Sequence, residues 1–249
     1  MVFDDVVSAQ LRGASARSRV ARLFQRGLLR FGVWVTPLSR FKREVVRLAY
    51  KKGGFSFVQI GANDGVSFDD FFWLVTQFNG QGLAIEPMAE AFERLTHNYR
   101  PYPSVAPLRL AVHPDMTEVS IFKVSPAKME SVPPWAFGSA SMDPSWLPRQ
   151  GVPTEMLESE TCPALSLMKI LEDNNIKDLN VLQIDVEGFD LEVIRMIDFT
   201  KLRPDLIRFE LPQPHNQDDF QEADLIVDLL RRNRYRVVRE GMDAIAISK

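Results

Sequence analysis

Residues Phe57–Gly65, with the sequence FVQIGANDG, carry the clearest indication of the fold. Its first four residues predict a buried strand, and the turn that follows is flanked by two glycines. A helical pattern covers residues 67–78, so the chain passes from strand to turn to helix. The same succession returns later, with strands expected at residues 82–85, 108–112, 181–184 and 206–211 and helices at 89–99, 166–174, 191–197 and 218–232. Alternation of this kind predicts a doubly wound α/β domain with a mainly parallel sheet.

The end of the chain predicts an antiparallel pair of strands. These strands are expected at residues 235–239 and 244–248, and only residues 240–243 separate them. A parallel crossover needs roughly a dozen residues or more, so the two strands should pair antiparallel. The prediction is a seven-stranded, mainly parallel sheet with the last strand antiparallel at the end of the sheet.

Residues 125–163 interrupt the alternation of strands and helices. They follow an added strand expected at residues 117–124, are rich in proline and carry no clear helical pattern. A long irregular segment inside a compact domain is usually functional or disordered. We therefore expect an insertion or lid at about residues 125–163, and this segment contains Trp135 and Trp146.

The formal net charge of −3 is unevenly distributed along the chain, and the N-terminal part is basic. Residues 1–52 hold twelve Lys/Arg against three acidic residues, a net charge of +9, which leaves −12 for residues 53–249. The acidic body argues against nucleic acid as a partner. We therefore expect two parts, a basic helical arm over residues 1–52 and an α/β domain over residues 53–249.

The arm has an amphipathic pattern at residues 20–31 and a second expected helix at residues 41–50. Three interpretations stay open: an arm packed on the acidic domain, a peripheral contact of residues 12–52 with an anionic membrane surface, and an Arg-rich organellar presequence. The sequence predicts no membrane-spanning helix and no secretory signal. The single cysteine, Cys162, excludes an internal disulfide framework and a cysteine zinc site. We expect a cytoplasmic protein, with peripheral contact at the inner membrane face as one option.

Ligands of doubly wound sheets bind beyond the carboxyl ends of the strands. The turn Gly61–Gly65 and Glu86 both follow such strand ends, and an acidic side chain at the position of Glu86 can hold both hydroxyls of a ribose. A dinucleotide site would need Gly-x-Gly-x-x-Gly to hold its pyrophosphate, whereas the spacing here is Gly-x-x-x-Gly with Asn63 in the middle. The turn therefore favours a cofactor without phosphate, S-adenosylmethionine, over NAD.

Two later strand ends carry the candidate acid–base groups. Asp185 and Glu187 flank one residue, so their side chains should point the same way while the chain stays extended. Two close negative charges raise at least one pKa, which suits a general base or the attraction of a sulfonium cation. The alternative is that either residue caps the next helix. Glu210 and His215 lie around the end of the following strand, where His215 is a candidate base at neutral pH. No spacing demands a metal, although Asp185, Glu187 and Glu210 can in principle hold Mg²⁺.

Three motifs resemble those of the FkbM-type S-adenosylmethionine-dependent methyltransferases: VQIGANDG at residues 58–65, IEP at 85–87 and IDVEGFD at 184–190. The similarity covers roughly residues 55–212, and the Ile-Asp-Val-Glu-Gly block is its most specific part. The resemblance implies the Rossmann-like fold of class I methyltransferases and O-methylation of a hydroxyl. Substrates of the family are commonly sugars of surface glycans, which implies polysaccharide biosynthesis, or secondary metabolites.

The resemblance also implies roles by position. The methionine end of the cofactor would be lined by residues of the glycine turn, Gly61, Asn63, Asp64 and Gly65. Glu86 would bind the ribose, Ala111 and Val112 would border the adenine, and Asp185 would face the methionine or the acceptor. Gln59 stands where many class I enzymes carry the acidic residue that contacts the amino group of the cofactor.

The sequence thus predicts an O-methyltransferase whose lid roofs a pocket for a small-molecule or glycan acceptor. Glu187 or Asp185 would accept the hydroxyl proton, with His215 as the alternative. The candidate acceptor contacts are Trp135, Trp146 and Glu210, and packing of the lid is the alternative role of the two indoles. Two other classes stay open: a dehydrogenase, for which the third glycine is missing, and a non-catalytic scaffold that uses the basic arm to hold a partner or a membrane.

Overall fold

The computed structural model describes residues 38–67, 71–211 and 217–249. One compact unit runs from Arg40 to Lys249 and holds all the elements described below. The amphipathic pattern at residues 20–31 lies outside the described residues, so the interpretations of that part of the arm stay predictions.

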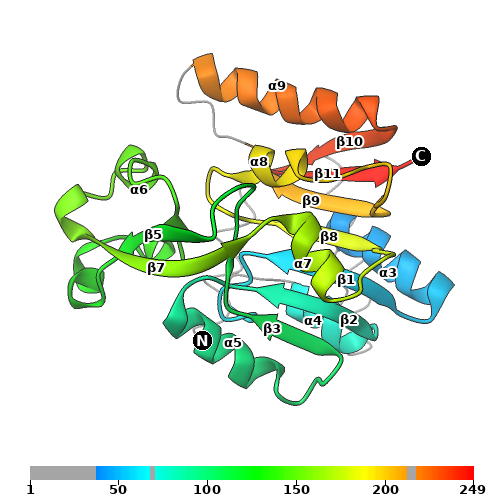
Figure 1. Ribbon diagram of the computed structural model, residues 1–249, viewed down its shortest axis with the longest axis horizontal. Helices are drawn as coiled ribbons and strands as arrows, with labels where there is room; N and C mark the ends of the chain where they lie inside the picture. The colour runs from blue at the N-terminus through cyan, green and yellow to red at the C-terminus, as the bar shows by residue number, and fades with distance from the viewer. Residues whose placement is uncertain (1–37, 68–70, 212–216) are drawn as a thin grey trace, which may run out of the picture. The chain divides into compact units, whose positions relative to one another are not determined.

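The main sheet has seven strands in the order β10-β11-β9-β8-β1-β2-β3, which Figure 1 shows from top to bottom. Their bounds are β1 Phe55–Ile60, β2 Gly80–Ile85, β3 Val105–Leu108, β8 Val181–Ile184, β9 Leu206–Glu210, β10 Tyr235–Glu240 and β11 Asp243–Ser248. The pairs from β3 to β9 are parallel, and β11 is antiparallel to both β9 and β10. This order and this single reversed strand confirm the Rossmann-like class I methyltransferase fold.

The last strand, β11, is antiparallel, as the sequence predicts, but it does not lie at the end of the sheet, where the sequence analysis expected it. β11 lies between β9 and β10, and β10 forms the edge. The reason is the apolar character of the two strands: Ala244, Ile245 and Ala246 of β11 are buried, whereas β10 carries Arg236 and Arg239 in exposed positions. A central strand is covered on both faces, and charged residues suit an edge strand.

Helices cover both faces of the main sheet. Alternate residues of β1 point to opposite faces, so Phe55 and Phe57 share a core with α3 Arg40–Lys52, α4 Phe71–Gln77 and α5 Ala89–Tyr99. Val58 and Ile60 share the opposite core with α7 Leu167–Asp173, α8 Asp190–Arg195 and α9 Gln217–Arg232. No helix in the described part of the chain combines the length and the apolar character that a membrane span needs.

The helix α3 is part of the compact unit. Phe41, Val45 and Ala49 recur every four residues and are buried against the main sheet. The helix expected at residues 41–50 is therefore present. The boundary expected between the basic arm and the α/β domain, between residues 52 and 53, falls inside the compact unit that begins at Arg40. Burial of one apolar stripe explains why this basic helix stays with the sheet.

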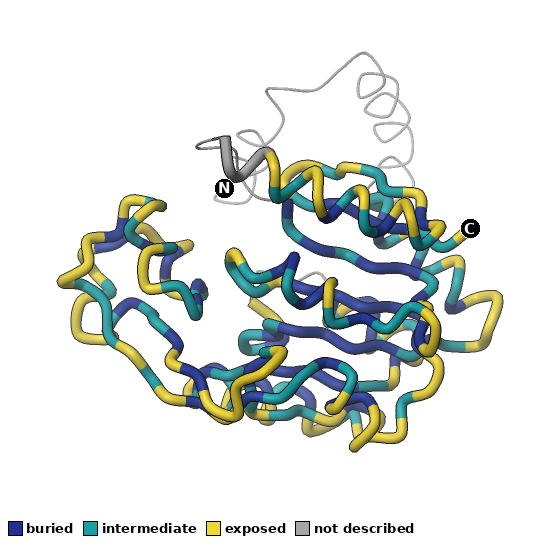
Figure 2. Tube along the Cα trace, turned by 45° about the horizontal axis from the view of Figure 1, so that its top comes forward, coloured by how far each residue is buried: buried dark blue, intermediate teal, exposed yellow. Residues whose placement is uncertain are grey.

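A second sheet builds the lid that projects from the main sheet (Figure 1). Its order is β4-β7-β5-β6, with β4 Ala111–Val112, β5 Glu118–Val124, β6 Ala140–Ser141 and β7 Leu157–Leu165. Four short helices complete the lid: η1 Pro126–Ser131, η2 Pro134–Phe137, α6 Trp146–Arg149 and η3 Thr154–Met156. The lid has its own apolar core of Val124, Val132, Ala136, Leu147 and Val152, seen as a separate buried group in Figure 2.

Two expectations about this region were wrong. Residues 108–112 do not form one strand, because β3 ends at Leu108 in the main sheet and β4 pairs with β7 in the lid. The segment expected to be irregular contains most of β7, whose residues 157–163 pair with the whole of β5. The acidic residues of this strand hide its β pattern in the sequence. In the fold, cations from other segments pair with Glu160: Lys123 Nζ lies 2.8 Å and Arg109 Nη2 lies 2.7 Å from its carboxylate.

Candidate active site

A pocket of about 260 Å³ opens at the carboxyl edge of the main sheet, where β1, β2 and β8 end beneath the lid. This edge is the topological switch point of the sheet, because the chain runs outward from β1 to β3 and returns to β8. The pocket is lined by nine residues that the sequence analysis singled out: Gln59, Gly61, Asn63, Glu86, Ala111, Val112, Trp135, Asp185 and Glu187. The fold thus gathers residues from both halves of the sheet around one cavity.

Backbone hydrogen bonds tie the three strand ends together at the floor of the pocket. Gly61 N donates to Ile85 O at 3.0 Å, and Asp185 N donates to Ile60 O at 3.0 Å. Gly61 has a φ of 78°, and a Cβ at this position would lie 1.8 Å from Asp185 O. Only glycine fits here, because any side chain would push the ends of β1 and β8 apart.

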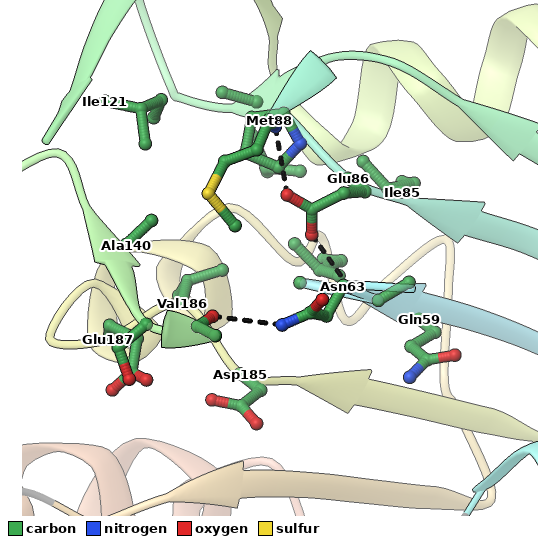
Figure 3. A pocket seen from close by; sticks show the side chains of 18 of the residues that line it. Gln59, Asn63, Ile85, Glu86, Met88, Ile121, Ala140, Asp185, Val186 and Glu187 are labelled. Atoms are coloured by element: carbon green, nitrogen blue, oxygen red, sulfur yellow. Dashed lines mark hydrogen bonds between the residues drawn. The ribbon is translucent and has the colours of Figure 1, made fainter. Parts of the chain in front are cut away.

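Glu86 is the most buried acidic group of the pocket, with 2% of its surface exposed. Its carboxylate accepts from Asn63 N at 2.8 Å and from Met88 N at 2.9 Å (Figure 3). Burial, with smaller contributions from the charges of Glu160 and Asp185, raises the pKa of Glu86 to about 7. Each carboxylate oxygen has a further lone pair, so Glu86 can still accept hydrogen bonds from a ligand.

The three other residues of the glycine turn differ in what they do. Asn63 lines the pocket, and its Nδ2 donates to Gly138 O of the lid at 3.0 Å. Asp64 does not line the pocket: its carboxylate accepts from Ser67 N and Oγ, both at 2.6 Å, and so closes the turn before α4. Gly65 packs against Leu95 and Tyr99 of α5. Of the four residues expected to line the pocket, Gly61 and Asn63 do so, and Ala62 of the same turn lines it as well.

A polar row crosses the sheet below the pocket. Gln59, Gln183 and Arg208 are neighbours in register on β1, β8 and β9, and all three line the pocket. Gln183 is 5% exposed, and its Oε1 has no hydrogen-bond partner among the described residues. A buried acceptor without a donor is costly. This acceptor fits the donor groups of a bound ligand, such as an ammonium or an amide.

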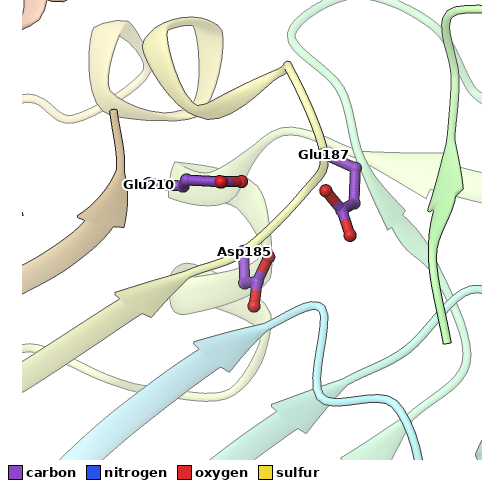
Figure 4. Close-up of side chains that lie close together, drawn as sticks. All are labelled: Asp185, Glu187 and Glu210. Carbon is purple, nitrogen blue, oxygen red and sulfur yellow. The ribbon is translucent and has the colours of Figure 1, made fainter. Parts of the chain in front are cut away.

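Asp185, Glu187 and Glu210 form a carboxylate cluster in which one oxygen of each residue lies within 4.8 Å of the others (Figure 4). Burial and the charges of Asp185 and Glu210 raise the pKa of Glu187 to about 8. Burial and the charge of Asp185, with a smaller effect of Asp243, raise the pKa of Glu210 to about 7. Like charges this close cannot all ionise without cost, so the cluster favours a proton or a cation.

The geometry of the cluster differs from the extended backbone that the sequence analysis expected. β8 ends at Ile184, and Glu187 has a φ of 50°. The two carboxylates nevertheless meet, because the turn at Glu187 brings its side chain back over Asp185. Neither residue caps α8, whose N-cap is Phe189. Three carboxylates in this arrangement are also ligands that a hard divalent cation accepts.

The lid contacts the cluster directly. The Ser139 hydroxyl donates to Trp135 O at 3.3 Å and lies beside the Glu187 carboxyl, where it partly offsets the rise of the Glu187 pKa, and Ser141 Oγ donates to Glu187 O at 2.8 Å. Trp135 lines the pocket and is 42% exposed. Trp146 does not line the pocket: its ring lies against Gly188, at the distance where a Cβ would clash. The structure thus brings one of the two expected indoles to the pocket and uses the other to hold the lid on the loop after β8.

The remaining site residues fall at the margin of the pocket or outside it. Glu210 belongs to the carboxylate cluster but does not line the pocket, and His215 lies outside the described residues. Sequence reasoning missed several lining residues, among them Met88, Leu110, Ile121, Ser139, Met142 and Arg208. Strand alternation could have found Arg208, which points to the same face of β9 as Glu210. No signal in the sequence marks the lid residues that line the pocket, because their position at the pocket depends on how the lid folds back over the sheet.

Comparisons with known proteins place the chain in a family. The sequence model of the Methyltransferase FkbM domain matches residues 59–237. No curated protein matches the sequence.

Solved structures with similar folds share little sequence with the chain. A protein from Klebsiella pneumoniae described as an O-methyltransferase is 13% identical, with a TM-score of 0.48 over 100% of this chain and 96% of that one. One from Staphylococcus aureus described as a caffeoyl-CoA O-methyltransferase is 11% identical, with a TM-score of 0.47 over 99% and 98%. The methyltransferase FkbM from Methylobacillus flagellatus is 13% identical, with a TM-score of 0.44 over 78% of this chain and 43% of that one. By the domain matched over residues 59–237, the chain belongs to the FkbM methyltransferase family.

Proposed function

We propose that the protein transfers the methyl group of S-adenosylmethionine to a hydroxyl, and that this hydroxyl belongs to a sugar of a surface glycan or to a secondary metabolite. One observation carries the proposal. A single pocket at the carboxyl edge of the sheet holds the buried Glu86 on one side and Asp185 and Glu187 on another, with the lid above them (Figure 3).

The residues on the Glu86 side fit the cofactor. Both oxygens of Glu86 are held in place by backbone N–H groups and keep lone pairs for the two hydroxyls of a ribose. Gln183 Oε1 is a buried acceptor that suits the amino group of a methionine moiety. When bound, the cofactor supplies a methyl group made electrophilic by its sulfonium. The absence of the third glycine of a pyrophosphate-binding turn supports this cofactor over NAD.

Glu187 is the proposed general base. With its raised pKa it holds a proton at neutral pH in the free protein. A positive charge in the pocket lowers the pKa of a nearby carboxyl, so Glu187 becomes able to accept the proton of an acceptor hydroxyl at its carboxylate oxygen. Ser141 holds the backbone of this residue and Ser139 lies beside its carboxyl, so the lid helps to orient Glu187 toward an acceptor.

The lid supplies the rest of the acceptor site. Trp135 offers a partly exposed indole face at the pocket, which suits the C–H face of a sugar ring. Carboxylates such as Asp185 accept hydrogen bonds from sugar hydroxyls. The bond between Asn63 and Gly138 links the glycine turn to the lid and helps to exclude water. Methyl transfer between two bound partners depends mainly on alignment, which this enclosure provides.

The first experiment is thermal denaturation of the full chain with S-adenosylmethionine, S-adenosylhomocysteine, NAD and NADP. A ligand at 100 times its Kd that binds only the folded state adds roughly 2.7 kcal/mol to the free energy of unfolding. We expect both sulfur nucleosides to stabilise the protein and the dinucleotides to have no effect. Stabilisation by NAD alone would support the dehydrogenase, and no effect of any ligand would support the non-catalytic scaffold. Methyl transfer from labelled cofactor to a panel of sugars then identifies the acceptor.

A further inference from the structure

The outer side of α3 and α4 carries an exposed aromatic row. Tyr50 is 80% exposed and Trp73 is 41% exposed. Phe78 lies between them, with ring centroids 5.9 Å from Tyr50 and 5.2 Å from Trp73. Lys42 Nζ lies 6.0 Å from the centroid of the Trp73 ring. Isolated exposed aromatics are common, but three in contact form a continuous apolar strip.

Basic side chains border this aromatic row. The helix α3 contains six Lys/Arg and one acidic residue, Glu44. Arg47 Nη1 lies 4.0 Å from Glu44 Oε2, which is a long ion pair, and Lys52 Nζ lies 2.8 Å from Asp205 Oδ2. Within the described ranges, Arg43 and Lys51 are exposed and pair with no acidic side chain. We call Tyr50, Trp73 and Phe78 with the basic residues of α3 the α3–α4 surface.

The exposed residues Arg43, Tyr50 and Lys51 of this surface lie outside the core that holds α3 on the main sheet. Phe41, Val45 and Ala49 hold α3 on the main sheet from its opposite side. A row of Tyr and Trp between Lys and Arg has the composition of a protein surface at the boundary of water and lipid, where aromatic rings meet the headgroups and cations meet anionic lipids. Residues 53–249 carry a net charge of −12, so the excess of basic residues is confined to the N-terminal part of the sequence, which includes α3.

We propose that the α3–α4 surface docks on the surface of an anionic lipid bilayer. The charge distribution favours a bilayer over a nucleic acid, because a flat membrane meets only this face, whereas a long polyanion would also meet the acidic body. The surface runs along the outside of α3 and α4 and does not include the pocket at the carboxyl edge. Docking would therefore leave the pocket open to an acceptor held at the membrane. The proposal does not depend on the reaction proposed above.

Sedimentation of the full chain with vesicles tests the proposal. We expect binding to vesicles of equal parts phosphatidylcholine and phosphatidylglycerol, and no binding to vesicles of phosphatidylcholine alone. High salt should weaken the binding, because it screens exposed charges. Arg43→Glu with Lys51→Glu should lower the affinity at least about tenfold, since two cations that attract the anionic headgroups become anions that repel them. Tyr50→Ser with Trp73→Ser should lower it several-fold by removing the interfacial aromatic contact.

Arg231→Glu with Arg232→Glu is the matched control, because it makes the same charge change on exposed residues of α9. This variant should bind the mixed vesicles nearly as well as the unchanged protein. Unfolding curves of all variants show whether each is folded. Absence of vesicle binding, equal loss in the control, or unchanged binding of both α3–α4 variants would overturn the proposal. Binding of RNA without binding of vesicles would overturn it in favour of a nucleic-acid partner.

Discussion

The pocket has two sides that are built differently. On the cofactor side, Glu86 is fixed by the backbone N–H groups of Asn63 and Met88, which follow the neighbouring strands β1 and β2. On the acceptor side, Glu187 depends on Ser139 and Ser141 of the lid and on the approach of Glu210 from another strand. Backbone contacts between adjacent parallel strands leave little freedom, whereas side-chain contacts between distant segments depend on how those segments pack. The cofactor side should therefore tolerate changes in the lid, and the acceptor side should not.

The largest effect should follow from Glu187→Gln, which separates the two sides most clearly. Loss of a general base lowers turnover by roughly 10²- to 10⁴-fold, while the cofactor contacts of Glu86 stay intact. Methyl transfer from labelled S-adenosylmethionine measures turnover, and calorimetric titration with S-adenosylhomocysteine measures binding. Glu158→Gln on the exposed lid strand is the control and should leave both unchanged. Near-normal turnover of Glu187→Gln would show that Asp185 or His215 takes the proton instead.

An intermediate effect is expected from Glu86→Gln, which removes one acceptor oxygen from the cofactor side of the pocket. The amide replaces one acceptor oxygen with a donor that opposes a backbone N–H group, so a charge-assisted hydrogen bond worth roughly 1.5–3 kcal/mol is lost. The Kd for S-adenosylhomocysteine should rise by about tenfold to a hundredfold by titration. Glu90→Gln on the exposed face of α5 is the control. An unchanged Kd would show that Glu86 supports the turn rather than the ligand.

The smallest effect concerns the pH dependence of stability. The folded state raises the pKa of Glu187 from 4.5 to about 8, so it favours the protonated form. The contribution of the protonated Glu187 to the free energy of unfolding is fully present below the pKa of the unfolded state and is lost as the pH rises through the pKa of the folded state. Glu187→Gln removes the dependence, and the variant should be more stable than the unchanged protein by roughly 2 kcal/mol near pH 6 and equal to it near pH 4.

Urea unfolding over this pH range measures the difference. Glu86 keeps its own raised pKa in both proteins and therefore cancels in the comparison. Parallel stability curves of the two proteins would contradict the prediction and would mean that Glu187 is not desolvated in solution.

Much of the fold follows from local patterns in the sequence. The helix α5 and the strand β8 have the bounds that the sequence analysis expected, because an unbroken apolar run and a clear helical periodicity mark them. The strand β7 was missed because its acidic residues find their cations on other segments. The position of β11 between β9 and β10 was missed because pairing order in a sheet is a non-local property.

The site divides in the same way. Gly61, Asn63 and Glu86 could be predicted because they directly follow strands whose ends must meet. Trp135 and Trp146 are alike in the sequence, yet only Trp135 lines the pocket. Their difference depends on the folding of the lid, which no local periodicity describes.

Local patterns in the amino-acid sequence are enough to predict the alternation of strands and helices, the edge of the sheet where a ligand binds, and the residue types at the strand ends. These follow from short-range sterics and from the burial of apolar residues at regular spacing. The packing of the folded chain, by contrast, brings Glu210 to Asp185 and Glu187, sets Ser141 of the lid against the backbone of Glu187, and buries Gln183 beside the pocket. These contacts join residues far apart in the chain, and packing of whole segments, rather than any local preference, brings such residues together.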